Sequence, residues 1–212
     1  MIEAVLFDLH GVVTSSPWAV LAEAGAGGGH TQDAVLAVML GDYATDSDHP
    51  WHRLERGETS FAEYATNVAV LAAEAGIELD WARLRGASDR IIANDAMIAR
   101  IRRLRADGVK TALVTNNVRE MASGWRRLLP DEELFDVVVD SSEVGVRKPN
   151  PAIFALALER LGGVRPARAV FLDDAPGNVE GARVAGLHAI LVDDIAEALV
   201  ALDVLLAAQE SN

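Results

Sequence analysis

Short apolar runs alternate with amphipathic stretches along most of this chain. Residues 4–9 form an apolar run bounded by Gly11, and its length and its valine, leucine and phenylalanine content favour a strand over a helix. From Asn94 onward the alternation is regular. Strand-like runs occur at 110–114, 136–139, 169–172 and 189–192, and helical patterns at 95–106, 120–129, 152–161, 179–185 and 196–207. Because parallel strands need crossover helices, this order predicts an α/β fold with a doubly wound parallel sheet.

The segment over residues 15–90 has a different character and separates the first two predicted strands. It contains three of the four tryptophans and the glycine-rich run Gly25–Gly29, which lacks the preceding strand and following lysine of a phosphate-binding loop. Ser60 and Glu63 have capping-box spacing ahead of an apolar stripe that Gly76 ends, so a helix is expected there. We therefore expect a helical cap at 15–90, inserted into a core domain made of residues 1–14 and 91–212.

Composition narrows the possible partners and surroundings. A net charge of -13 argues against nucleic acid as a partner, because affinity for it comes largely from cationic contacts, and favours a small molecule. The chain has no cysteine, so a metal would need oxygen or imidazole ligands. No apolar stretch approaches the roughly 18 residues of a membrane span, and the first apolar run ends too early for a secretory signal. We expect a cytoplasmic protein that does not contact a membrane.

Polar residues interrupt the predicted sheet at four places, each at or beyond the carboxyl end of a strand. They are Asp8, Thr115-Asn116-Asn117, Arg147-Lys148-Pro149 and Asp173-Asp174. Ligands of open parallel sheets bind beyond these strand ends, so we expect the four groups to converge. Each alone is ordinary loop chemistry, such as a turn or a helix cap. Together they supply a carboxylate nucleophile, hydroxyl and amide donors, a lysine and an acidic pair, which are the parts that phosphoryl transfer needs.

At these positions the sequence resembles the haloacid dehalogenase superfamily. The four motifs of that family match residues 7–12, residues 114–116, Lys148-Pro149, and residues 172–178, so the resemblance spans the whole chain. The branch that includes the phosphatase domain of soluble epoxide hydrolases is especially similar, in its Thr-Asn-Asn run and in its paired aspartates followed by Asn178. The resemblance implies a Rossmann-like core with a helical cap inserted between the first two motifs.

The predicted chemistry begins with Asp8 as the nucleophile that attacks phosphorus. A carboxylate is repelled by a phosphate dianion unless cations cancel the charge, and Mg²⁺ is expected on Asp8 and Asp174. The resemblance adds the backbone carbonyl of His10 as a metal ligand, and Asp173 is assigned to the metal shell directly or through water. Lys148 is expected between the nucleophile and the phosphoryl oxygens as a fixed positive charge.

Three further residues are expected to support this centre. Thr115 supplies a hydroxyl donor, and Asn116 supplies a backbone or amide donor, to the phosphoryl oxygens. Asn178 lies one turn into the helix after the fourth strand and is expected to orient Lys148 or the metal shell. The predicted activity is hydrolysis of a small phosphorylated metabolite through an aspartyl phosphate.

His10 departs from the family pattern, in which a second aspartate stands two residues after the nucleophile. Histidine can protonate a leaving alkoxide and later accept a proton from water, and this is our hypothesis. The alternatives are a phosphate-binding or partner-binding relic without turnover, and a haloacid dehalogenase that works on carbon without a metal. His49 and His52 are expected either to line a substrate pocket or to lie on a solvated face, and His188 to be structural.

Overall fold

The computed structural model describes residues 1–18, 21, 29–81 and 91–208. At its centre lies a sheet of five parallel strands in the order β3-β2-β1-β4-β5. The strands are β1 (Ala4–Phe7), β2 (Lys110–Thr115), β3 (Val137–Asp140), β4 (Ala169–Asp173) and β5 (His188–Leu191). The predicted doubly wound α/β core is confirmed. The strand order changes direction between β1 and β4, which is where such sheets bind ligands.

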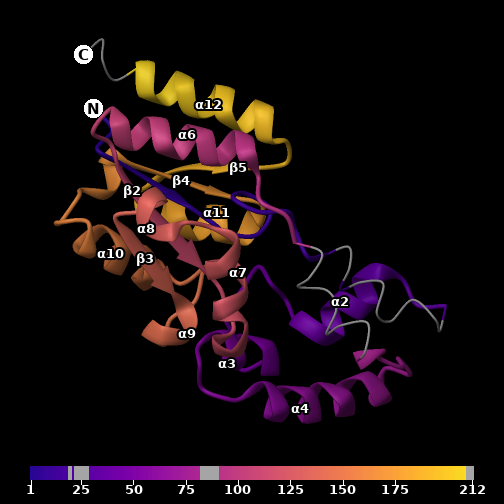
Figure 1. Ribbon diagram of the computed structural model, residues 1–212. Helices are drawn as coiled ribbons and strands as arrows, with labels where there is room; N and C mark the ends of the chain where they lie inside the picture. Colours follow the sequence, from indigo (N-terminus) through magenta and orange to yellow (C-terminus); the bar gives the residue numbers. More distant parts are fainter. Residues whose placement is uncertain (19–20, 22–28, 82–90, 209–212) are drawn as a thin grey trace.

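Helices cover both faces of the sheet, as continuous apolar strands require (Figure 1). One face packs against α6 (Asp95–Ala106), α7 (Ala122–Leu128), α8 (Asp131–Leu134) and α12 (Ile195–Ala207). The other face packs against α10 (Pro151–Arg160) and α11 (Pro176–Val184), while the short α9 (Ser141–Val144) follows β3. Alternate strand residues separate the two cores: Val5, Phe7 and Leu172 face the first, and Leu6, Val114 and Phe171 face the second.

The helices begin where polar caps precede apolar periodicity. The side chain of Asn94 accepts a hydrogen bond from the Met97 N–H at the start of α6, and Asn150 caps α10. The helix predicted at 120–129 is shorter in the structure, because the 3-10 turn η3 (Arg119–Met121) takes the place of its first residues. A second 3-10 turn, η4 (Pro166–Arg168), precedes β4. The third strand begins at Val137, one residue later than predicted, because the Asp136 side chain accepts the Thr111 N–H.

The insert contains α2 (Gln32–Leu40), α3 (Pro50–Glu55) and α4 (Phe61–Glu74), which lie together beyond one edge of the core (Figure 1). The predicted capping box of α4 is present: Ser60 and Glu63 exchange hydrogen bonds. These helices build two small apolar clusters of their own. The boundaries proposed for the cap stay a prediction, because residues 82–90 and most of Gly25–Gly29 lie outside the described residues. No helix in the described ranges is both long and apolar enough to span a membrane.

Candidate active site

The four polar interruptions meet at the carboxyl edge of the sheet, beside the change in strand order. Lys148 Nζ lies 2.6 Å from Asp8 Oδ1 and 2.7 Å from Asp173 Oδ2. Carboxylate oxygens of Asp8, Asp173 and Asp174 all lie within 4.8 Å of one another. Residues from three separate strand ends are therefore close enough to act on one ligand.

Lys148 is held from its backbone as well as from its side chain. The Asn116 side chain donates from Nδ2 to the Lys148 carbonyl at 3.0 Å and accepts the Lys148 N–H at 2.7 Å. The buried lysine is thus fixed in place by the loop after the neighbouring strand β2. This pairing fixes the Asn116 amide against Lys148 through its oxygen and one of the two Nδ2 hydrogens, and the backbone N–H of Asn116 is a separate donor that can serve a phosphoryl oxygen.

Thr115 ends β2 fully buried, with its hydroxyl 3.4 Å from the Asn116 carbonyl. That distance is long for a hydrogen bond between oxygens, so the hydroxyl can rotate toward another acceptor. The next residue but one, Asn117, is anchored by its Nδ2, which donates to Asp140 Oδ2 at 2.7 Å. The loop after β2 is therefore rigidly attached to the end of β3.

Asp173 is saturated by donors from the protein. Asn178 Nδ2 lies 3.1 Å from each of its oxygens, and the Ala175 N–H donates to Oδ1 at 2.8 Å. Together with Lys148, these donors engage both oxygens of the fully buried carboxylate. Asn178 thus orients the acidic pair. With Asp173 so engaged, Asp8 and Asp174 are better placed as direct metal ligands.

Asp174 packs against a glycine. Gly11 has a φ of +82°, and a Cβ added to it would lie 2.0 Å from Asp174 Oδ2. Only a residue without a side chain lets the carboxylate approach the backbone just after the nucleophile so closely. The position of Gly11 just after Asp8 in the first motif was a signal in the sequence, but it did not reveal Asp174 as the partner.

The charges in this centre are crowded. Burial, followed by the charges of Asp8 and Asp173, raises the pKa of Asp174 to about 8, and burial raises the pKa of Asp173 to about 6. Burial also raises the pKa of Asp8, although Lys148 opposes the shift. Burial by itself would lower the pKa of Lys148, but the charges of Asp173 and Asp8 outweigh it and raise that pKa.

This crowding fits a cation. Three carboxylates face one ammonium group, which leaves an excess of negative charge in a buried place. All the donors are oxygens, which is the ligand type that Mg²⁺ prefers. Asp8 and Asp174, with the nearby backbone, form a donor set suited to that ion, and the fit rests on this chain's own geometry.

His10 lies beside the centre with its Nδ1 3.0 Å from Thr14 Oγ1. The single hydroxyl proton of Thr14 has carbonyl acceptors at Leu9 and Ser15, 3.1 Å and 3.3 Å away. When that proton is donated to a carbonyl, Nδ1 carries the imidazole proton and Nε2 presents its lone pair. Burial, aided by the charge of Lys148, lowers the pKa of His10 to about 4. His10 is therefore neutral near pH 7, and in this tautomer its Nε2 is a hydrogen-bond acceptor.

A buried ion pair joins the insert to the core next to this centre. Arg147 Nε lies 2.7 Å from Glu55 Oε2, and both side chains are almost wholly buried. The Tyr43 hydroxyl donates to Glu55 Oε1 at 3.0 Å, and Arg147 also donates to the Thr45 carbonyl at 2.8 Å. Arg147 was predicted to lie at the catalytic edge, with no role assigned to it. Nothing in the sequence singled out Glu55, because a glutamate in a short helix is ordinary.

The histidines of the insert have structural surroundings. His52 is fully buried, and its Nδ1 accepts the Ser47 N–H at 3.0 Å, so it does not lie on a solvated face. His49 is the N-cap of α3 and accepts the Trp51 N–H at 3.2 Å. His188 begins β5, in agreement with its structural interpretation.

A family model described as haloacid dehalogenase-like hydrolase matches residues 2–186. The chain belongs to the haloacid dehalogenase-like hydrolases. The predicted resemblance is confirmed, and the strand ends that carry the family's motifs are the ones that converge on Asp8 and Lys148.

Two of the curated relatives are much longer proteins. The chain is 33% identical over 209 residues to mouse acyl-CoA dehydrogenase family member 10, covering 96% of this chain and 19% of that protein. It is 36% identical over 115 residues to rat bifunctional epoxide hydrolase 2, covering 52% of this chain and 20% of that protein. The chain thus spans about a fifth of the length of these two relatives. Several other relatives have phosphatase in their names.

Solved structures share the fold. A haloacid dehalogenase family enzyme of Bacteroides thetaiotaomicron, solved in complex with magnesium and inorganic phosphate, superposes with a TM-score of 0.62. The two are 19% identical, and the match covers 90% of this chain and 94% of that one. The likeness establishes the haloacid dehalogenase-like fold for this hydrolase.

Proposed function

We propose that this hydrolase is a Mg²⁺-dependent phosphatase that hydrolyses a small phosphate monoester through an aspartyl phosphate on Asp8. The observation that carries the proposal is the placement of Lys148 between Asp8 and Asp173, with Asp174 close by. The phosphatases among the relatives, and the family enzyme solved with magnesium and phosphate, support the same reaction class.

In the first step a carboxylate oxygen of Asp8 bonds to phosphorus while the ester P–O bond breaks, and the organic group leaves as an alcohol. In the second step a water oxygen attacks the same phosphorus, the bond to Asp8 breaks, and inorganic phosphate is released. Lys148 offsets negative charge on Asp8 and on the phosphoryl group. Mg²⁺, when held by Asp8, Asp174 and the His10 carbonyl, supplies the remaining positive charge that a dianion requires.

The leaving oxygen takes a proton from solvent water to give the alcohol, and the attacking water must lose a proton. We assign the water proton to His10, because its Nδ1 is engaged with Thr14 and Nε2 is left as an acceptor. Thr115 and the backbone N–H of Asn116 are assigned to the equatorial phosphoryl oxygens, where charge spreads in the transition state. Of the two proton transfers predicted for His10, the proposal keeps the one in which His10 accepts a proton from water.

The test is phosphate release from a panel of sugar, nucleotide and lipid phosphates, with MgCl₂ or with EDTA. We expect release with MgCl₂ alone and its loss in Asp8→Asn. Magnesium-dependent capture of beryllofluoride without turnover of any ester would favour a phosphate-binding relic instead. Halide release from 2-haloacids that persists in EDTA would favour a dehalogenase.

The role of His10 has its own test, a pH–rate profile of wild type against His10→Asp and His10→Ala. If His10 takes the water proton, His10→Ala should be slow at every pH, and His10→Asp should be active with a shifted acid limb. Identical profiles for all three proteins would contradict the role.

A further inference from the structure

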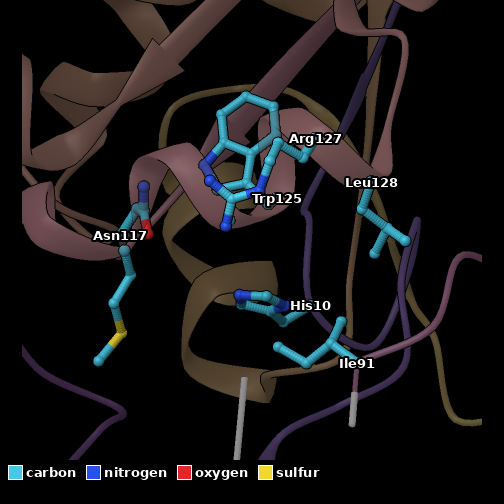
Figure 2. A pocket seen from close by; sticks show the side chains of 8 residues that line it. His10, Ile91, Asn117, Trp125, Arg127 and Leu128 are labelled. Carbon is cyan, nitrogen blue, oxygen red and sulfur yellow. The ribbon is translucent and has the colours of Figure 1, made fainter. Parts of the chain in front are cut away.

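A cavity of about 280 Å³ lies between His10 and helix α7 and is called the α7 cavity below. Asn117, from the loop after β2, also lines it. Figure 2 shows His10 on one side of the space, with Trp125 and Arg127 on the side opposite. The cavity therefore borders the catalytic edge of the sheet, on the side where His10 lies. It offers space next to His10 for the organic group of a phosphate monoester held at Asp8.

The walls of the α7 cavity are mostly apolar. Trp125 is buried and forms one wall, and Ile91 contributes an aliphatic side chain. Met121 and Leu128 also line it, and they are 41% and 38% exposed. Exposed apolar side chains beside a catalytic centre suggest contact with a ligand, because a bound carbon skeleton would cover them.

Gly124 leaves space in this wall. It lies within α7 without a positive φ, so no backbone constraint calls for glycine, and a Cβ added there would meet nothing within 4 Å. Glycine inside a helix costs about 1 kcal/mol relative to alanine. The helix bears this cost where its surface faces the α7 cavity.

Arg127 brings charge to the α7 cavity. Among the described residues that line it, Arg127 alone is permanently charged, and it is exposed to solvent at the cavity wall. Its neighbour Arg126, by contrast, lies 3.3 Å from Glu143 and stacks on Trp125. Figure 2 shows the Arg127 side chain in front of the Trp125 ring, on the side of the cavity opposite His10. In a chain of net charge -13, a guanidinium at the wall of a cavity can attract an acidic group of a ligand.

We propose that the α7 cavity binds the leaving group of the substrate and that Arg127 pairs with a second acidic group on it. The substrate class is then a compact phosphate monoester that carries a carboxylate or a second phosphate. This inference rests on the proposed phosphatase function and narrows it. A volume of about 280 Å³ has room for a short carbon chain that carries one acidic group.

The experiment compares three esters with similar skeletons: glycerol 3-phosphate, 3-phosphoglycerate and 1,3-propanediol bisphosphate. We expect wild type to have a lower KM for one or both of the acidic esters than for glycerol 3-phosphate. Arg127→Met should raise that KM by at least about fivefold and leave kcat nearly unchanged. Which acidic ester responds identifies the carboxylate or the second phosphate as the group recognised.

The matched control is Arg103→Met, which removes the same charge from an exposed position on α6 where Arg103 pairs with Asp107 at 3.9 Å. It should leave all three KM values unchanged. Gly124→Phe should fill the α7 cavity and raise the KM of every ester while beryllofluoride capture at Asp8 persists. Circular dichroism of each variant checks folding.

Two kinds of failure remain distinct. Turnover of all three esters with equal KM values that Arg127→Met does not change would overturn this inference and leave the phosphatase intact. Absence of turnover for every ester would count against the phosphatase. In that case, calorimetric titration with the same esters still tests the α7 cavity. Asp8→Asn is compared with the double variant that also carries Arg127→Met, and equal affinities for the acidic esters would overturn the role of Arg127.

Discussion

Replacing Gly11 by alanine should disable the centre through Asp174. The added Cβ would lie 2.0 Å from Asp174 Oδ2, whereas real Cβ contacts essentially never fall under 3.0 Å. The carboxylate must therefore move by about 1 Å or more. A misplacement of about 1 Å in a catalytic constellation costs on the order of 10²-fold in rate, so we expect kcat/KM to fall about 100-fold. The concentration of Mg²⁺ at half-maximal activity should rise as well.

The left-handed backbone adds a separate cost to stability, and Gly108 provides the control. Gly108 has a φ of +80°, close to that of Gly11, but a Cβ there would meet nothing within 4 Å. Both alanine variants should lose about 1–2 kcal/mol of unfolding free energy in urea, from backbone strain alone. Only Gly11→Ala should lose activity towards p-nitrophenyl phosphate. Equal activity of the two variants would refute the link between Gly11 and the position of Asp174.

Three other changes test the buried charges. Lys148→Met should lower kcat/KM by about 10³-fold and the unfolding free energy by about 3–5 kcal/mol, because two buried carboxylates lose their shared cation. The control is Lys110→Met, which removes the other lysine of the chain and should keep full activity. Glu55→Gln and Arg147→Met should each lower the unfolding free energy in urea by about 3 kcal/mol. The double variant should lose less than the sum of the two single losses, and additive losses would contradict a coupled pair. Burial lowers the pKa of His52 from 6.5 to about 4, so its neutral form stabilises the fold fully above pH 6.5 and this contribution is lost as the pH falls toward 4. The difference in unfolding free energy between wild type and His52→Gln should therefore shrink across that range, and a constant difference would rule out the His52 contribution.

The order of strands and helices was readable from the sequence because periodicity and caps act locally. The stripe after Ser60 and the cap at Asn94 depend on residues within one or two helical turns, and both predictions are confirmed. The convergence of Asp8, Lys148 and Asp174 was also predictable. Parallel strands place their carboxyl ends on one edge, so polar residues at those ends must meet once the topology is known.

Tertiary structure decided which partner each of these groups takes. The Asn116 amide, one of the two donors expected to serve a phosphoryl group, holds the backbone of Lys148. Arg147 pairs with Glu55, 92 residues away. Gly124 and Arg127 line a cavity beside the active site only because α7 packs next to His10, which the sequence did not indicate. The sequence by itself determined the elements and the edge where chemistry gathers. Packing alone fixed the pairings, because a buried polar group bonds to whichever neighbour the fold brings within reach, and local pattern carries no record of that neighbour.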